Sequence, residues 1–154
     1  MKQWLMKSEP DVFSFQDLKN KPQKTEPWNG VRNYQARNFM RDQMQPGDLV
    51  LFYHSSCKLP GIAGIARISS HPYPDETQFL PDSEYYDPKS KKDNPIWFLV
   101  DVSFEENLKK FIPLEEIKRH EKLSNMRLLQ KGNRLSILPV TDEEFRFIKN
   151  LGNY

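Results

Sequence analysis

Five short apolar runs, each ending at turn residues, restrict this chain to a fold built around a sheet. The clearest run is IWFLVDVSF at residues 96–104. The other four are QWLMK (3–7), LVLFYHS (49–55), IAGIARIS (62–69) and RLSILPV (134–140). Aliphatic, aromatic and β-branched residues between turn signals are typical of β-strands. Because the helical segments are short, the sequence predicts an α+β fold, a curled mixed sheet or small β-barrel of five or more strands flanked by short helices.

Potential capping residues mark the beginnings of the helices. We expect helices after Ser14 and Thr141, because each is followed three residues later by an acidic residue, which is the spacing of a capping box. Asn33 is placed to cap a helix over about 34–42. Two further short helices are predicted over 113–119 and 124–130.

Length and charge set the domain organisation and the expected compartment. The 154 residues suffice for one compact domain, so we assign 1–154 to a single domain. The formal net charge is only +2, so attraction to phosphates has to come from a local patch. The single cysteine, Cys57, allows no intramolecular disulfide, and no apolar stretch approaches the ~20 residues that span a bilayer. We expect a monomeric protein without membrane contact, cytoplasmic or, in a eukaryote, nuclear.

Residues 71–94 are rich in proline, aromatic and charged residues and predict a long irregular excursion. Such a loop is unusual in a compact domain and indicates a functional segment. Its lysines at 89, 91 and 92 offer a basic rim, although a charge run of this kind is more often a solvated surface.

Several kinds of chemistry find no support in the sequence. His54, His71 and His120 are far apart and lack the spacing of metal ligands, so neither a metal nor a cofactor is expected. No glycine-rich phosphate loop is present. In YHSSC (53–57), His54 and Ser56 share a strand face, but the turn of a nucleophile elbow is missing. A strand-end histidine in a hydrogen-bond network is therefore favoured over a nucleophile pair.

The stretch WNGVRNYQARN (28–38) combines amides, guanidiniums and aromatic rings. Amides read base edges, rings stack on bases, and arginines bind phosphates with paired donors. The same residues could equally be core rings with capping asparagines, and composition does not separate these readings.

Six blocks, at the usual order and spacing, resemble the EVE domain family. They are WLMKSEP (4–10), WNGVRNYQARN (28–38), MQPGDLVLFYHSS (44–56), GIAGIARI (61–68), WFLVDV (97–102) and RLSILPV (134–140). EVE domains resemble YTH and PUA domains, so the resemblance implies a PUA-like mixed β-barrel. It also implies recognition of a modified nucleobase, such as methylated or hydroxymethylated cytosine or methylated adenine, in an aromatic-lined pocket of a DNA- or RNA-binding protein. Animal relatives of the thymocyte nuclear protein type are associated with oxidised methylcytosine in DNA.

The resemblance also implies which residues bind the base. Lys7 and Ser8 are expected at the pocket edge, Trp28 as a wall, and Gly30 where the backbone passes close to the ligand. The remaining expected site residues supply hydrogen bonds, wall area or a phosphate contact: Asn33, Tyr34, Asn38, Tyr53, His54, Ser55, Arg134 and Ser136.

Two alternatives stay open at this point. One is an enzyme on a modified base or nucleic acid, with Lys7 or His54 as general base. The other is an interaction domain whose pocket takes a small ligand or a peptide. The sequence lacks a paired carboxylate, a metal set and a cofactor loop, which favours binding over catalysis.

Overall fold

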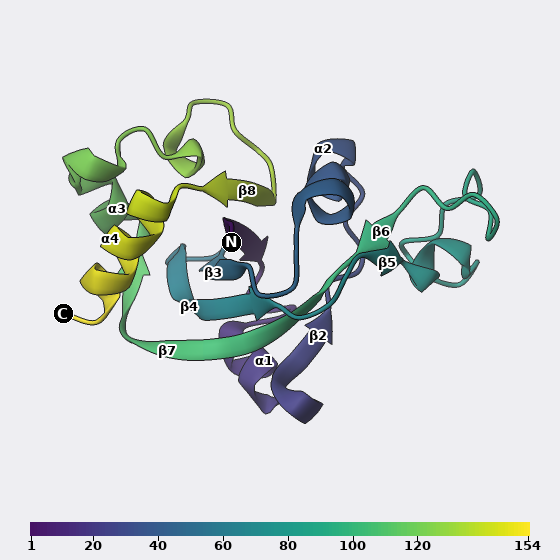
Figure 1. Ribbon diagram of the computed structural model, residues 1–154, viewed down its shortest axis with the longest axis horizontal. Helices are drawn as coiled ribbons and strands as arrows, with labels where there is room; N and C mark the ends of the chain where they lie inside the picture. The colour runs from purple at the N-terminus through teal and green to yellow at the C-terminus, as the bar shows by residue number, and fades with distance from the viewer.

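A six-stranded sheet forms the frame of the protein, in the order β2-β7-β4-β3-β1-β8 (Figure 1). The computed structural model describes residues 1–154. Strand bounds are β1 Gln3–Ser8, β2 Thr25–Pro27, β3 Leu49–His54, β4 Gly61–Ile68, β7 Asp101–Pro113 and β8 Ile137–Val140. Strands β1 and β3 are parallel and every other neighbouring pair is antiparallel. The predicted α+β fold with a curled mixed sheet of five or more strands is therefore confirmed.

The sheet is covered on both faces by apolar layers, because side chains alternate along each strand. Trp4 and Met6 of β1 belong to one layer, which α1 (Phe15–Asn20) and α2 (Tyr34–Asn38) complete. Leu5 belongs to the other layer, beneath α3 (Leu114–Arg119) and α4 (Asp142–Gly152). Burial on both faces explains why the central strands are continuous apolar runs in the sequence.

The predicted helix caps are confirmed. Ser14 and Thr141 each form a complete capping box, with Asp17 and Glu144 respectively. The Asn33 side chain accepts a hydrogen bond from the backbone N–H of Ala36 at 3.0 Å. The helix that it caps is α-helical only over α2 and continues as one π-helical turn, Phe39–Gln43.

Several boundaries differ from the sequence expectation. The run 96–104 divides into β6 (Phe98–Leu99) and the long β7, whose second half is hidden in the sequence by the charges of its exposed face. Residues 25–27 form the edge strand β2, which no sequence pattern indicates. The last strand begins at Ile137 rather than at 134, and 124–130 holds only the 3-10 turn Arg127–Leu129.

The 71–94 excursion is largely irregular, as expected, and extends beyond the main sheet (Figure 1). Its regular parts are the ribbon strand β5 (Tyr73–Pro74), which pairs with β6, and the 3-10 turn Glu76–Phe79. The fully buried Gln78 amide organises the segment: it donates to the carbonyls of Asp75 and Trp97 and accepts from the N–H of Trp97. No helix is both long and apolar enough to cross a membrane.

Candidate functional site

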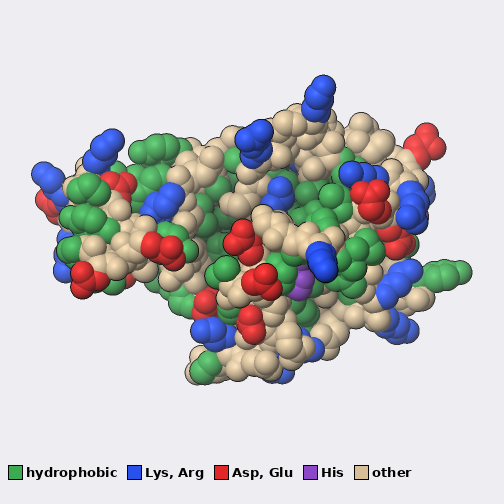
Figure 2. Space-filling model, turned by 180° about the vertical axis from the view of Figure 1, so that it is seen from behind, with side chains coloured by type: hydrophobic (Ala, Val, Ile, Leu, Met, Phe, Trp, Pro, Cys, Tyr) green, Lys and Arg blue, Asp and Glu red, His purple; other side chains and the backbone are tan.

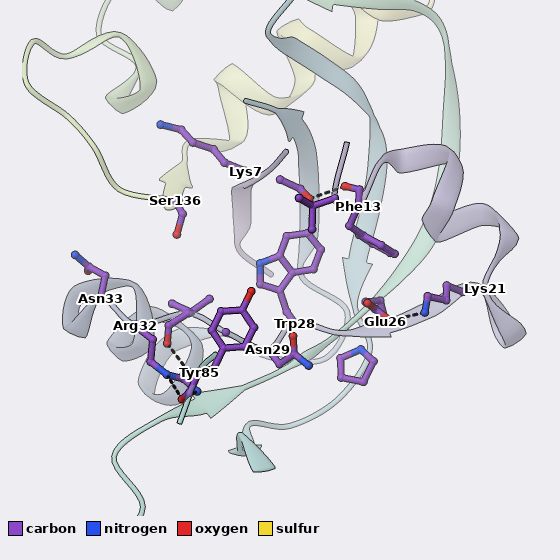
Figure 3. A pocket seen from close by; sticks show the side chains of 15 residues that line it. Lys7, Phe13, Lys21, Glu26, Trp28, Asn29, Arg32, Asn33, Tyr85 and Ser136 are labelled. Carbon is purple, nitrogen blue, oxygen red and sulfur yellow. Dashed lines mark hydrogen bonds and ion pairs between the residues drawn. The ribbon is translucent and has the colours of Figure 1, made fainter. Parts of the chain in front are cut away.

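A cavity of about 480 Å³ opens beside the end of β1, between the 26–33 segment and the loop that carries Tyr85 (Figure 3). Half of the residues predicted for the site line it: Lys7, Ser8, Trp28, Gly30, Asn33 and Ser136. These residues come from β1, from the segment ahead of α2 and from the residue before β8, so the fold brings together positions far apart in the sequence.

Trp28 lies at the centre of the cavity wall (Figure 3). Its side chain is held edge-on against Phe52 and Phe13, with ring centroids 5.6 and 6.2 Å apart. Only 9% of the residue is exposed, and its backbone N–H donates to Val100 O at 2.9 Å. The indole Nε1 has no acceptor in the protein, yet no buried polar side-chain atom is unpaired, so Nε1 must reach the cavity.

Free donors gather on one side of this indole. The Lys7 ammonium, the Ser136 hydroxyl and the Asn33 amide nitrogen have no partner in the protein, and Figure 3 shows all three around the same opening. Burial lowers the pKa of Lys7. The other side of the cavity carries an ion pair, Lys21 to Glu26 at 3.3 Å. The cavity thus offers donors at one end and a carboxylate at the other, which suits a flat ligand with both acceptors and an amino group.

A buried ionic brace fixes the remaining wall. Asp75, only 1% exposed, accepts hydrogen bonds from Gly30 N at 2.8 Å and from Arg32 Nη1 at 3.1 Å. Arg32 also donates to the carbonyl of Tyr85 at 2.8 Å. Gly30 has a φ of +83°, and a Cβ there would lie 2.6 Å from the Tyr85 ring. Glycine is therefore required for the ring to close over the backbone.

Hydrogen bonds decide the charge of Asp75. Burial by itself would raise its pKa, but the donors of Thr77, Gly30 and Arg32 together outweigh burial, and the pKa lies below its ordinary value. The carboxylate therefore stays ionised at neutral pH. The Arg32 guanidinium donates to Asp75, to Thr77 and to the carbonyls of Val31 and Tyr85. Arg32 therefore stabilises the wall and is not free to bind a phosphate.

Two predicted site residues on α2 lie outside the cavity. The Tyr34 ring stacks on Trp97, with centroids 4.9 Å apart, and 57% of the residue is exposed. The Asn38 side-chain oxygen Oδ1 accepts from Arg37 Nη2 at 2.8 Å. Consecutive helical side chains diverge, so only the cap Asn33 faces the opening.

The predicted site residues Tyr53, His54 and Ser55 also lie outside the cavity. Tyr53 lies in the apolar layer opposite Trp28, and burial raises its pKa to about 12. His54 Nε2 accepts from the backbone N–H of Phe15 at 3.1 Å, so it positions α1 and is not available as a general base in the cavity. Ser55 lies outside the cavity and its N–H donates to Ser8 O at 3.0 Å. Arg134 is exposed, precedes the lining residue Ser136 by two positions, and does not line the cavity.

Sequence reasoning missed nine of the fifteen lining residues, among them Phe13, Glu26, Asn29 and Tyr85. Asn29 lies inside the quoted block 28–38, and Phe13 follows the block 4–10 by three positions, so both could have been included by proximity. Tyr85 gave only the general signal of a long aromatic-rich loop. No group of three or more His, Cys, Asp or Glu side chains is arranged to hold a metal ion.

The chain is similar to proteins of known sequence and structure. Human thymocyte nuclear protein 1 is 49% identical over 165 residues, covering 96% of this chain and 72% of that protein. The crystal structure of human THYN1 in complex with 5-methylcytosine-containing DNA superposes with a TM-score of 0.93 at 48% identity, covering 100% and 99% of the chains. A Pseudomonas syringae protein of known structure has a TM-score of 0.90 at 47% identity, covering 97% and 99%. Residues 2–151 match the EVE domain, and the chain belongs to this family.

Proposed function

We propose that this protein is a nucleic-acid reader that binds one modified nucleobase in the Trp28 cavity. The observation that carries the proposal is the unpartnered indole Nε1 beside the free Lys7 and Ser136 groups, all facing one opening. The human relative solved with 5-methylcytosine-containing DNA makes methylated cytosine in DNA the first ligand to test. Hydroxymethylated cytosine, methylated adenine and RNA are the next ligands.

The cavity has the properties that such a ligand requires. Its volume of about 480 Å³ falls within the ~300–1,000 Å³ of small-ligand sites. Stacking of a base on an aromatic ring contributes ~1–3 kcal/mol, which offsets the few kcal/mol needed to unstack it. A methyl group on the base replaces empty space against Trp28 or Phe13. One added methyl contributes ~1–3 kcal/mol, so discrimination of about 10- to 200-fold over the unmodified base is expected.

Affinity that does not depend on sequence comes from cations at and around the cavity rather than from the wider surface. Positive and negative side chains are mixed on the face seen in Figure 2, in keeping with the net charge of +2. Phosphate attraction must therefore come from a local set of cations, such as Lys7 and Lys21 in the cavity and the exposed Arg134, and should weaken as salt rises. A reader of nucleic acid is expected in the cytoplasm or, in a eukaryote, the nucleus.

A binding panel tests the proposal. Short single- and double-stranded DNA and RNA, each with and without one modified base, are titrated at two salt concentrations. Ser136→Phe, which fills the cavity, should abolish the preference for the modified base, while Ser124→Phe, on an exposed turn elsewhere, should keep it. Equal affinity for modified and unmodified probes in the native protein would overturn the proposal. Recovery of chemically unchanged probe separates binding from the enzymatic alternative, which now rests on Lys7 alone.

A further inference from the structure

A ladder of stacked groups connects the cavity wall with the protein surface. The Arg32 guanidinium carbon lies 5.5 Å from the ring centroid of Tyr85 and 5.3 Å from that of Trp97. The Trp97 ring stacks in turn on Tyr34, at 4.9 Å between centroids and 28° between planes. The ladder therefore runs from Tyr85, which lines the cavity, to Tyr34, which does not.

The inner members of the ladder are fixed by hydrogen bonds. Trp97 Nε1 donates to Asp87 Oδ2 at 2.7 Å, and its backbone N–H donates to the buried Gln78 at 2.9 Å. Arg32 is pinned by Asp75 and by the Tyr85 carbonyl. Trp97 is only 4% exposed, so the exposed Tyr34 ring packs on a rigid, buried side chain.

The outermost ring has the setting of a base-stacking platform. Tyr34 is 57% exposed and has a cationic neighbour, the Arg37 guanidinium carbon, 4.9 Å from its ring centroid. Arg41 lies one turn further along, paired with Asp42. Tyr34 directly follows Asn33, which lines the cavity. Consecutive Cα atoms are ~3.8 Å apart, so the residue that carries the platform adjoins one that lines the cavity.

We propose that Tyr34 is a second nucleic-acid contact, which stacks on the base next to the one held in the cavity. This inference rests on the proposed function, because it requires a base at Trp28. Stacking is tolerant of base identity, since every base has a π-face. The platform would thus add affinity for a strand containing the modified base without adding sequence preference.

The test combines a protein variant with a change in the probe. Single-stranded DNA with one central 5-methylcytosine is titrated with the native protein, Tyr34→Ala and Tyr34→Phe. The same probe is made with an abasic site on either the 5′ or the 3′ side of the modified base. Tyr34→Ala should weaken binding about 5- to 150-fold, the range that corresponds to one lost stack, and Tyr34→Phe should retain binding. Tyr86→Ala, at another exposed tyrosine outside the ladder, is the matched control.

Measuring Tyr34→Ala against the abasic probes separates the loss of stacking from any change in folding. One of the two abasic probes should bind the native protein more weakly by the same factor, and against that probe Tyr34→Ala should have no further effect. If the effect of the abasic site and the effect of Tyr34→Ala multiply for both abasic probes, the platform is overturned. An unchanged affinity of Tyr34→Ala for the intact probe would overturn it as well. If cavity-filled Ser136→Phe loses the preference for the modified base while Tyr34→Ala binds normally, only the platform fails. If Ser136→Phe keeps that preference, the cavity itself is refuted.

Discussion

Replacement of Asp75 by asparagine should loosen the cavity wall and destabilise the whole domain. The side chain is 1% exposed and accepts from Gly30 N, Arg32 Nη1 and the Thr77 N–H and hydroxyl. An amide keeps the shape but turns one oxygen into a donor that faces other donors. Hydrogen bonds to charged groups contribute ~1.5–3 kcal/mol, and an unpaired buried donor costs a further ~1–3 kcal/mol. The Arg32 side chain is 23% exposed, so water screens part of its interaction with Asp75 and reduces the cost. We therefore expect a loss of about 2–4 kcal/mol in the free energy of unfolding.

Urea and thermal unfolding measure this loss. In a domain of this size ~1 kcal/mol corresponds to about 2–4 °C, so the Tm should fall by about 4–16 °C. The control is Asp82→Asn, the same chemical change at an exposed position of the same loop. The folded pKa of Asp75 is lowered, so its stabilisation is present above the ordinary value of 3.8 and disappears as the pH falls through the folded pKa. Equal unfolding free energies for the two variants at pH 7 would refute the brace.

Two further predictions concern the supports of the site. Burial lowers the pKa of His54 below its ordinary 6.5, so native stability should decline as the pH falls from about 6.5 through the folded pKa. His54→Gln, which keeps an acceptor for Phe15 N–H, should remove that part of the decline in pH-dependent unfolding; an identical pH profile would count against the assigned role. Gly30→Ala should destabilise more than Gly132→Ala, because both positions have positive φ but only Gly30 faces the Tyr85 ring. Equal losses in Tm would show that Tyr85 does not pack there.

The sheet was largely predictable because the central strands are buried on both faces. β1, β3 and β4 therefore read as continuous apolar runs. The far half of β7 was missed, since its burial alternates and charged residues fill the exposed face. β2 is three residues long and polar, and its strand character comes from pairing with β7 rather than from its own sequence.

The site was predictable only where its residues belong to one motif block. Trp28, Gly30 and Asn33 lie in a single short segment and share the cavity. A motif does not show on which face of a strand each of its residues lies. Side chains alternate along β3, so Tyr53 points away from the face on which Phe52 packs against Trp28. Tyr85 depends on the brace between Arg32 and Asp75, which are 43 positions apart, and no local pattern indicates such a contact.

The most direct measurement follows the three indole N–H signals by ¹⁵N NMR during titration with a 5-methylcytosine oligonucleotide. Trp4 Nε1 is bonded to Asp48 and Trp97 Nε1 to Asp87, whereas Trp28 Nε1 is free at the cavity. A Trp28→Phe variant identifies the third signal. The account predicts that the Trp28 signal shifts strongly on binding, and less with unmodified cytosine, while the buried Trp4 signal stays in place. Saturable binding that leaves the Trp28 signal unmoved would contradict the account.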